Sequence, residues 1–286
     1  MEKNLFSSAT DIEQDKANIS IDLYKRLLKF TENLKKDFLK NSKTFENQLE
    51  FSLLNEECYY KLYSEIKDIK SIKPLNNFFS EINGLEELNK KAYKFFINPR
   101  NKSIKGLDVQ LGNKFDEALM NFFNSIGIKA GRADKKNKRL PDIHILDNTK
   151  NIKAYIEHKY HNAPFMLSHK LIGREAYEGS ITMDTKKIKN QIIECEAELD
   201  DRPVYIVHWV DFHHLKGIFF NTLSQIKEYL NLNENEFVRK SRDGDYKLVN
   251  KVNLKKGYLE KFYPPLHEMG DFSELVKLLS PNVKKP

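Results

Sequence analysis

The chain has 286 residues, enough for one large domain or two smaller ones, and its hydrophobic content of 40% is ordinary for a globular protein. A net charge of +7 favours a polyanionic partner, although lysine is frequent along the whole chain and marks no single binding face. The sequence contains no apolar run of membrane-spanning length and no secretory signal, and its two cysteines lack metal-ligand spacing, so we expect a reducing, cytoplasmic setting without a membrane.

Residues 1–100 form the first predicted region, which is helical. Apolar residues such as Leu23, Leu27 and Leu34 recur at intervals of three or four, with charged residues between them. Pro99 ends the last such stretch, which makes residues 99–105 a plausible hinge. Three roles fit this region equally well: positioning DNA, forming a dimer interface and supporting the core.

A further helix is predicted to begin at Gly112, and it carries two adjacent acidic residues. Its apolar stripe consists of Leu111, Phe115, Leu119, Phe122 and Ile126. At roughly 100° per residue, Asp116 falls on the edge of this stripe and Glu117 on the far side. Asp116 is therefore the better candidate for a buried site. The alternative is that an acidic first turn merely complements the helix dipole.

The next segment predicts a β-hairpin with a cluster of charges on one face. Residues 141–147 and 152–160 alternate in polarity, and residues 148–150 between them are typical of a turn. An even-numbered loop sets Asp142 directly opposite Glu157, with Cβ atoms about 5 Å apart. Side chains alternate along a strand, so Lys159 shares the face of Glu157 and His158 points away.

Two carboxylates at this distance repel each other unless one is protonated or a cation lies between them. Mg²⁺ suits such a site because it takes one or two protein carboxylates, keeps several waters and accepts phosphate oxygens. A lysine beside the ion would orient the attacking water and offset charge on the phosphate. The cluster thus predicts phosphodiester hydrolysis, and its alternative is a solvated hairpin with incidental charges.

These residues resemble the PD-(D/E)XK nucleases and, within them, the type II restriction endonucleases: Pro141, Asp142, Glu157 and Lys159 match the motif as written. The resemblance implies Asp142 and Glu157 as Mg²⁺ ligands, the main-chain carbonyl of His158 as a further ligand, and Lys159 as the catalytic lysine. It also implies double-stranded DNA as substrate. Many restriction endonucleases carry glycine, an aromatic residue and then an acidic residue in the preceding helix. This pattern implies that Asp116 joins the active site, although glutamate is commoner there and Glu117 stays an alternative.

The elements after the hairpin complete a predicted α/β core. Residues 184–199 are expected to form a helix, residues 204–212 a buried strand, residues 217–220 a shorter strand and residues 222–230 another helix. We therefore predict a restriction-endonuclease-like core over residues 101–230, with a mixed central sheet flanked by helices. The chain has no glycine-rich phosphate loop, so no nucleotide cofactor is expected.

Two basic segments are candidates for contacting DNA. The long stretch from 161 to 183 leaves the strand that carries Glu157, and its Lys170 and Arg174 could contact phosphates or guanine. Residues 231–286 are predicted to hold a hairpin, in which residues 237–242 and 246–252 flank Asp243-Gly244. Its candidate DNA-binding residues are Arg239, Lys240 and Arg242. Incidental surface charge is the alternative for both segments.

The sequence thus predicts a Mg²⁺-dependent, sequence-specific DNA endonuclease of a restriction-modification system. We expect a homodimer, because two active sites related by a twofold axis most simply cut both strands of a palindrome. Asp116 would assist through a water or a second metal ion. A repair or recombination nuclease of the same fold, a non-catalytic DNA-binding protein and an RNA nuclease are the alternatives.

Overall fold

The computed structural model describes residues 9–41, 54–64, 84, 107–134, 140–161, 181, 183–199, 201–212, 215–231, 238–239, 246–249, 252–255, 261–262, 264 and 266–280. In the N-terminal region, the described part is helical, as the sequence predicts. It contains α1 (Ala9–Leu28), a 3-10 turn (Lys29–Thr31), α2 (Glu32–Asn41) and α3 (Glu56–Ser64). None of the helices in the described ranges is long and apolar enough to cross a membrane.

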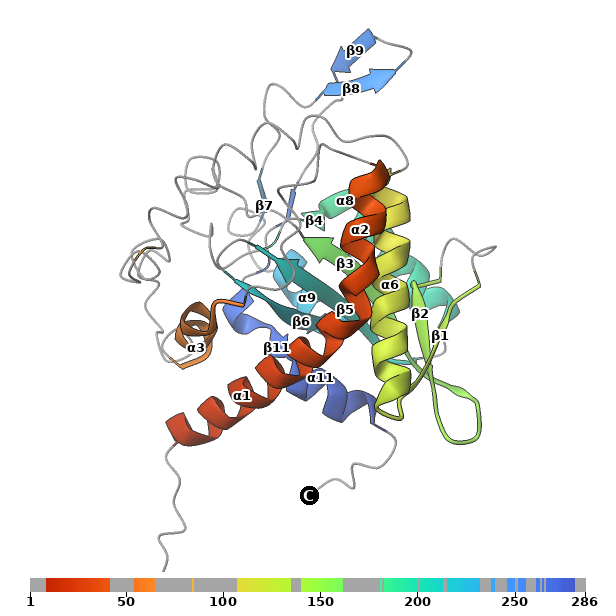
Figure 1. The fold of residues 1–286 in the computed structure, drawn as a ribbon. Helices are drawn as coiled ribbons and strands as arrows, with labels where there is room; N and C mark the ends of the chain where they lie inside the picture. Colours follow the sequence, from red (N-terminus) through yellow and green to blue (C-terminus); the bar gives the residue numbers. More distant parts are fainter. Residues whose placement is uncertain are drawn as a thin grey trace, which may run out of the picture.

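A mixed six-stranded sheet forms the centre of the protein (Figure 1). Its elements and the helices between them follow in this chain order: α6 (Leu107–Ser125), β1 (Lys129–Arg132), β2 (Ile143–Leu146), β3 (Ile152–His161), α8 (Thr185–Glu198), β5 (Val204–Asp211), β6 (Lys216–Thr222), α9 (Leu223–Asn231), β11 (Gly270–Asp271) and α11 (Phe272–Leu279). The strand order across the sheet is β1-β2-β3-β5-β6-β11. Only β3 and β5 run parallel, and the other neighbours are antiparallel. The predicted mixed α/β class is thus confirmed.

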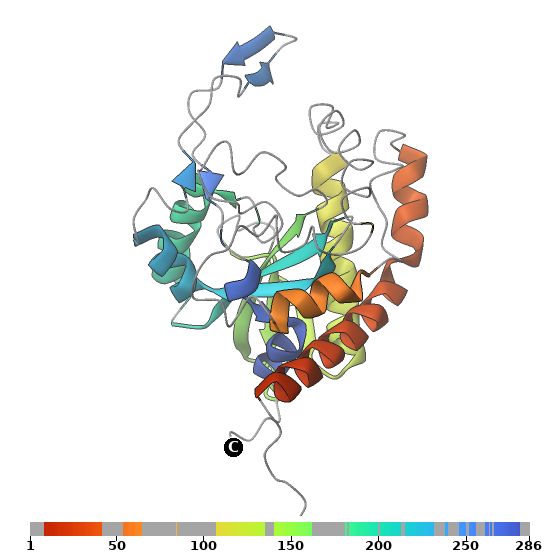
Figure 2. The same ribbon diagram turned by 90° about the vertical axis from the view of Figure 1, so that its left-hand side faces the viewer.

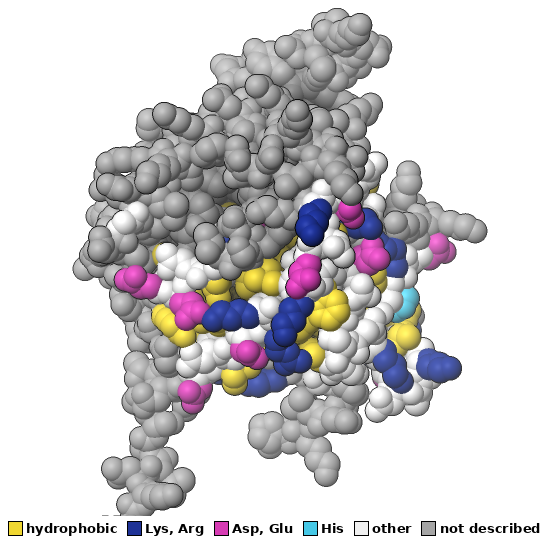
Figure 3. All heavy atoms as spheres, viewed as in Figure 1, with side chains coloured by type: hydrophobic (Ala, Val, Ile, Leu, Met, Phe, Trp, Pro, Cys, Tyr) yellow, Lys and Arg dark blue, Asp and Glu magenta, His cyan; other side chains and the backbone are white. Residues whose placement is uncertain are grey.

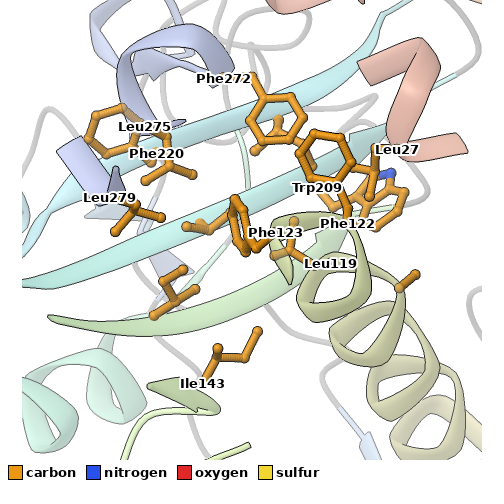
Figure 4. Packing of buried hydrophobic residues seen from close by; sticks show 14 of the residues in the cluster. Leu27, Leu119, Phe122, Phe123, Ile143, Trp209, Phe220, Phe272, Leu275 and Leu279 are labelled. Atoms are coloured by element: carbon orange, nitrogen blue, oxygen red, sulfur yellow. The ribbon is translucent and has the colours of Figure 1, made fainter. Parts of the chain in front are cut away.

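Helices cover both faces of this sheet, as the two views of the ribbon show together (Figure 1 and Figure 2). On one face, α6, α11 and the C-terminal half of α1 pack against the strands, with Trp209 and Phe122 fully buried between them (Figure 4). On the other face, Ile188 of α8, Ile226 of α9 and Tyr59 of α3 pack against the alternate strand residues. β5 is buried along its whole length, and apart from His208 and Asp211 its residues are apolar or aromatic on both faces.

Local signals explain where the core helices start. Asp184 accepts a hydrogen bond from the main-chain N–H of Lys187, so it caps α8, which lies within the predicted range of 184–199. Asp271 and Glu274 form a capping box at the start of α11, with Asp271 Oδ1 accepting from the Glu274 N–H at 2.8 Å. This helix packs Phe272 and Leu275 into the same core as α6. α11 and its strand β11 are not among the elements predicted from the sequence.

Helix α6 begins at Leu107, five residues before the predicted start at Gly112. The residues before Gly112 continue the helical periodicity, and a single glycine inside a helix costs only about 1 kcal/mol. Asp116 therefore lies in the third turn of α6, and the interpretation as a first-turn acidic residue that complements the helix dipole is wrong.

The strand pairing predicted for residues 237–252 is wrong. β7 (Val238–Arg239) pairs with β10 (Lys261–Phe262), which also pairs with β4 (Met183–Asp184) in a three-stranded sheet. β8 (Tyr246–Val249) pairs with β9 (Val252–Lys255) instead, across a two-residue connection of the length that favours tight hairpins. Asp243 and Gly244, which carried the prediction, lie outside the described residues.

Candidate active site

The β2–β3 hairpin has the predicted register where it matters for the site. Ile143 pairs with Ile156 and Ile145 with Ala154, so one step further Asp142 stands opposite Glu157. The turn is not the simple even-numbered loop that the sequence analysis assumes. Within the turn, Asp147 Oδ1 accepts hydrogen bonds from the main-chain N–H groups of Thr149 and Asn151. The register of the two strands shifts between Ile145 and Leu146, so the pairs from Ile145 toward the site have the predicted register although the turn does not have the predicted form.

Asp142, Glu157 and Lys159 lie on one face of this hairpin. Ile143 and Ile156, which alternate with them, pack into the core beneath α6, so the three charged residues face the opposite side of the sheet. The Lys159 ammonium contacts Glu157 Oε1, and Glu157 is only 5% exposed. Asp142 Oδ2 accepts a hydrogen bond from the main-chain N–H of His158 at 3.0 Å. The structure therefore brings the three predicted residues together.

The electrostatics of this cluster favour an added cation. Burial and, next, the negative charge of Glu157 raise the pKa of Asp142 to about 6, while Lys159 opposes this rise. A carboxyl that is poorly stabilised as an anion gains when a divalent ion replaces its proton. Two carboxylates side by side, one buried and one partly buried, are the hard oxygen donors that Mg²⁺ prefers, so these residues fit that ion. No group of three or more His, Cys, Asp or Glu side chains in the described ranges is arranged to hold a metal, so the ligand set would depend on water, phosphate and main-chain oxygens.

His158 points to the other face, as alternation predicts, and contacts helix α6 there. Its Nδ1 lies 2.8 Å from Asp116 Oδ1, and the second oxygen of Asp116 accepts a hydrogen bond from Arg132 Nη1 at 2.9 Å. Burial alone would raise the pKa of Asp116, but the hydrogen bonds and charges of His158 and Arg132 outweigh it and lower the pKa. Asp116 is thus an anion whose contacts are on the far side of the strand from Lys159.

Glu117 does not share this position. Asp116 is buried, whereas Glu117 is exposed and pairs with Lys114, whose Nζ is 3.6 Å from Glu117 Oε2. The helical wheel predicts this difference correctly, although it places the start of the helix too late. Of the two acidic residues, Asp116 is the one that contacts the strand of Glu157.

A chain of three polar side chains lies on the face of Glu157 and Lys159. His208 stands beside Lys159 in the parallel pairing of β3 and β5. Its Nε2 is 3.2 Å from Asn221 Oδ1, and its Nδ1 is 3.2 Å from His161 Nε2. An amide oxygen can only accept, so Nε2 of His208 carries the proton and Nδ1 accepts. Burial, followed by the charges of His161 and Lys159, holds the pKa of His208 well below its usual range.

Several residues around the site carry no signal in the sequence. No motif or periodicity in the sequence marks Arg132, Asn221 or His208 as part of the site. Arg132 and Asp116 meet only because β1 folds back along α6, and His208 reaches Lys159 only through the parallel pairing of β3 with β5. A prediction from the sequence that β3 and β5 pair in parallel and in this register would have placed His208 beside Lys159.

The predicted DNA-binding residues are mostly outside the described ranges. This applies to Lys170, Arg174, Lys240 and Arg242, while Arg239 is the last residue of β7 and its side chain is not described. On the coloured part of the surface in Figure 3, basic and acidic side chains are interspersed over the N-terminal helices. That part of this face therefore carries no broad basic patch.

Comparison with known proteins gives no family for this chain. No protein-family model matches it. No curated protein sequence matches it either. The functional inference therefore depends on the geometry of the site.

Proposed function

We propose that this protein is a Mg²⁺-dependent endonuclease that hydrolyses phosphodiester bonds of double-stranded DNA. One observation carries the proposal: Asp142 and Glu157 lie opposite each other on two paired strands, and Lys159 shares their face. This is the arrangement on which the resemblance to the PD-(D/E)XK nucleases depends. The elevated pKa of Asp142, which results first from burial and next from the charge of Glu157, supports a cation at this position, because the ionised carboxyl is poorly stabilised without one.

Each residue of the cluster would have a separate role. Asp142 and Glu157 would hold the ion, and the main-chain carbonyl of His158 would complete the protein's share of the ligands. A bound Mg²⁺ would supply an activated water and neutralise negative charge on the phosphate. Lys159, which contacts Glu157 at the same face, would orient that water and stabilise the additional charge of the pentacoordinate phosphate.

The finer assignment, a type II restriction endonuclease that acts as a homodimer, is part of the same proposal. It is supported by the motif resemblance and by the symmetry of palindromic cleavage. A repair or recombination nuclease of the same fold would cut at a DNA structure instead of at a base sequence. Sequencing the ends of the fragments separates the two, because only a restriction enzyme gives ends with a constant sequence.

The test is incubation of the purified protein with long duplex DNA and Mg²⁺, with EDTA as the control. We expect discrete fragments that require the metal. Lys159→Ala should reduce cleavage by at least about 100-fold and leave DNA binding in Ca²⁺ largely intact, because the lysine acts on the reaction more than on docking. Lys114→Ala, which removes an exposed lysine of α6, is the matched control and should cut normally.

Cleavage by the Lys159→Ala variant at the wild-type rate would refute the proposed role of the cluster. The same holds if the wild-type protein cuts equally well in EDTA. Running RNA and DNA side by side tests the substrate class, and cleavage of RNA alone would contradict the DNA endonuclease.

A further inference from the structure

We propose that Asp116 is a positioning residue that holds the metal-binding strand through His158, and that it does not bind the metal itself. This inference builds on the proposed function and changes the role expected of Asp116, which the sequence analysis places on a water or a second metal ion. It follows from the contacts of both carboxylate oxygens and from the face of the sheet on which they lie.

Both oxygens of Asp116 are already engaged by protein groups. Oδ1 is 2.8 Å from His158 Nδ1, and Oδ2 is 2.9 Å from Arg132 Nη1. Arg132 is itself fixed, since its guanidinium donates to the side chain of Asn113 at 3.2 Å and to the main-chain carbonyl of Asn113 at 2.8 Å. An ion at Asp116 would have to share an oxygen with one of these charge-assisted hydrogen bonds, in a buried site on the far side of β3 from Lys159.

The position of His158 explains what this anchor does. Its side chain extends to Asp116 on one face of β3, while its main-chain N–H donates to Asp142 on the hairpin. The residues on either side of it, Glu157 and Lys159, carry the charges of the candidate site. Fixing the His158 ring therefore fixes the segment of main chain from which a ligand, a carbonyl and the catalytic lysine all extend. This corresponds to the outer-shell partners that orient metal ligands in many sites.

The protonation of His158 agrees with such an anchor. A carboxylate only accepts, so Nδ1 of His158 must carry the proton in this hydrogen bond. Nε2 is buried without a hydrogen-bond partner among the described residues, close to Trp209, whose ring centroid is 6.1 Å from that of His158. Asp116 thereby holds the proton on Nδ1 and fixes the ring orientation.

The test measures how many Mn²⁺ ions bind and how tightly, by calorimetry and electron paramagnetic resonance, in the full-length protein. Asp116→Asn keeps an oxygen that can accept from His158, so we expect an unchanged number of ions and an affinity within about threefold of wild type. Asp116→Ala removes the anchor, and we expect the same number of ions with an affinity lower by about 10- to 100-fold. Glu117→Gln, which removes the exposed neighbouring carboxylate, should bind like wild type.

Loss of one bound ion in Asp116→Asn would overturn the inference, because only a direct ligand sets the number of ions. A second readout does not depend on metal: the imidazole ¹⁵N NMR signals of His158 should show a proton on Nδ1 in wild type and in Asp116→Asn, and a changed tautomer in Asp116→Ala. An unchanged tautomer in Asp116→Ala would also overturn it. If wild type binds no ion, the proposed function fails, while the NMR measurement still decides whether Asp116 holds His158.

Discussion

Asp142 lies where an ionised carboxyl is poorly stabilised. It is partly buried and faces Glu157, and its pKa rises to about 6 from the ordinary value of 3.8. The folded protein therefore binds a proton at Asp142 more tightly than the unfolded chain does. As the pH rises from about 4 to 6, the unfolded chain ionises first, and the folded state loses stability; above pH 6 this loss is complete.

Replacing Asp142 with asparagine should accordingly stabilise the metal-free protein at high pH. The change keeps an oxygen that can accept from the His158 N–H but removes the charge. In EDTA at pH 8 we expect Asp142→Asn to raise the free energy of unfolding by on the order of 2–3 kcal/mol. The gain should narrow steadily from pH 6 to pH 4, and urea unfolding at several pH values measures it. A variant that is destabilised equally at every pH would contradict this account of Asp142.

The grouping of Asp142, Glu157 and Lys159 could be predicted from the sequence because it depends only on strand alternation and on the register of one hairpin. The contact between His158 and Asp116 could not be predicted in this way. These residues are 42 positions apart, and their contact depends on how α6 lies across the sheet. The engagement of Asp116 by Arg132 depends on β1, which the sequence analysis does not predict at all.

Among the helices and strands, length and a regular apolar pattern determine which ones can be predicted from the sequence. The long, mostly apolar β5 and the amphipathic α8 are close to their predicted bounds. β1 (KAGR) contains no β-branched or aromatic residue and β11 has only two residues, so neither shows a recognisable alternation. α11 has only eight residues, yet Asp271 and Glu274 have the spacing of a capping box, a signal that could have predicted its start.

Two glycines test how tightly these elements pack. In β11, a Cβ on Gly270 would lie 2.2 Å from Cε1 of Phe220, whereas a Cβ on Gly112 in α6 would meet nothing within 4 Å. We expect Gly270→Ala to lower the free energy of unfolding by about 1–3 kcal/mol, because the Phe220 ring must shift in a packed core. Gly112→Ala should instead stabilise the protein by up to about 1 kcal/mol, because alanine favours the helix.

Thermal unfolding of the two variants measures these opposite effects, and each kcal/mol corresponds to roughly 2–4 °C in a protein of this size. An unchanged melting temperature for Gly270→Ala would show that β11 does not pack against Phe220. A lower melting temperature for Gly112→Ala would show that the space beside α6 is occupied.

At the scale of the whole molecule, segments from both ends of the chain complete the core around the candidate site. Leu27 of α1 and Phe272 of α11 are fully buried in the cluster that contains Trp209 (Figure 4). The Tyr24 hydroxyl also accepts a hydrogen bond from the Trp209 indole at 3.3 Å. The described parts of residues 1–100 and 231–286 therefore contribute to the same packed core as the hairpin. Local periodicity could not reveal this, because the contacts join residues far apart in the sequence.

The central claim is that Asp142 and Glu157 bind one divalent ion together. Diffraction from crystals of the protein soaked in Mn²⁺ tests it most directly, because the anomalous signal locates the ion without assumptions about the reaction. We expect a single strong peak within coordination distance of a carboxylate oxygen of Asp142 and one of Glu157. A peak that touches neither carboxylate, or carboxyl groups on opposite sides of the sheet, would contradict the claim.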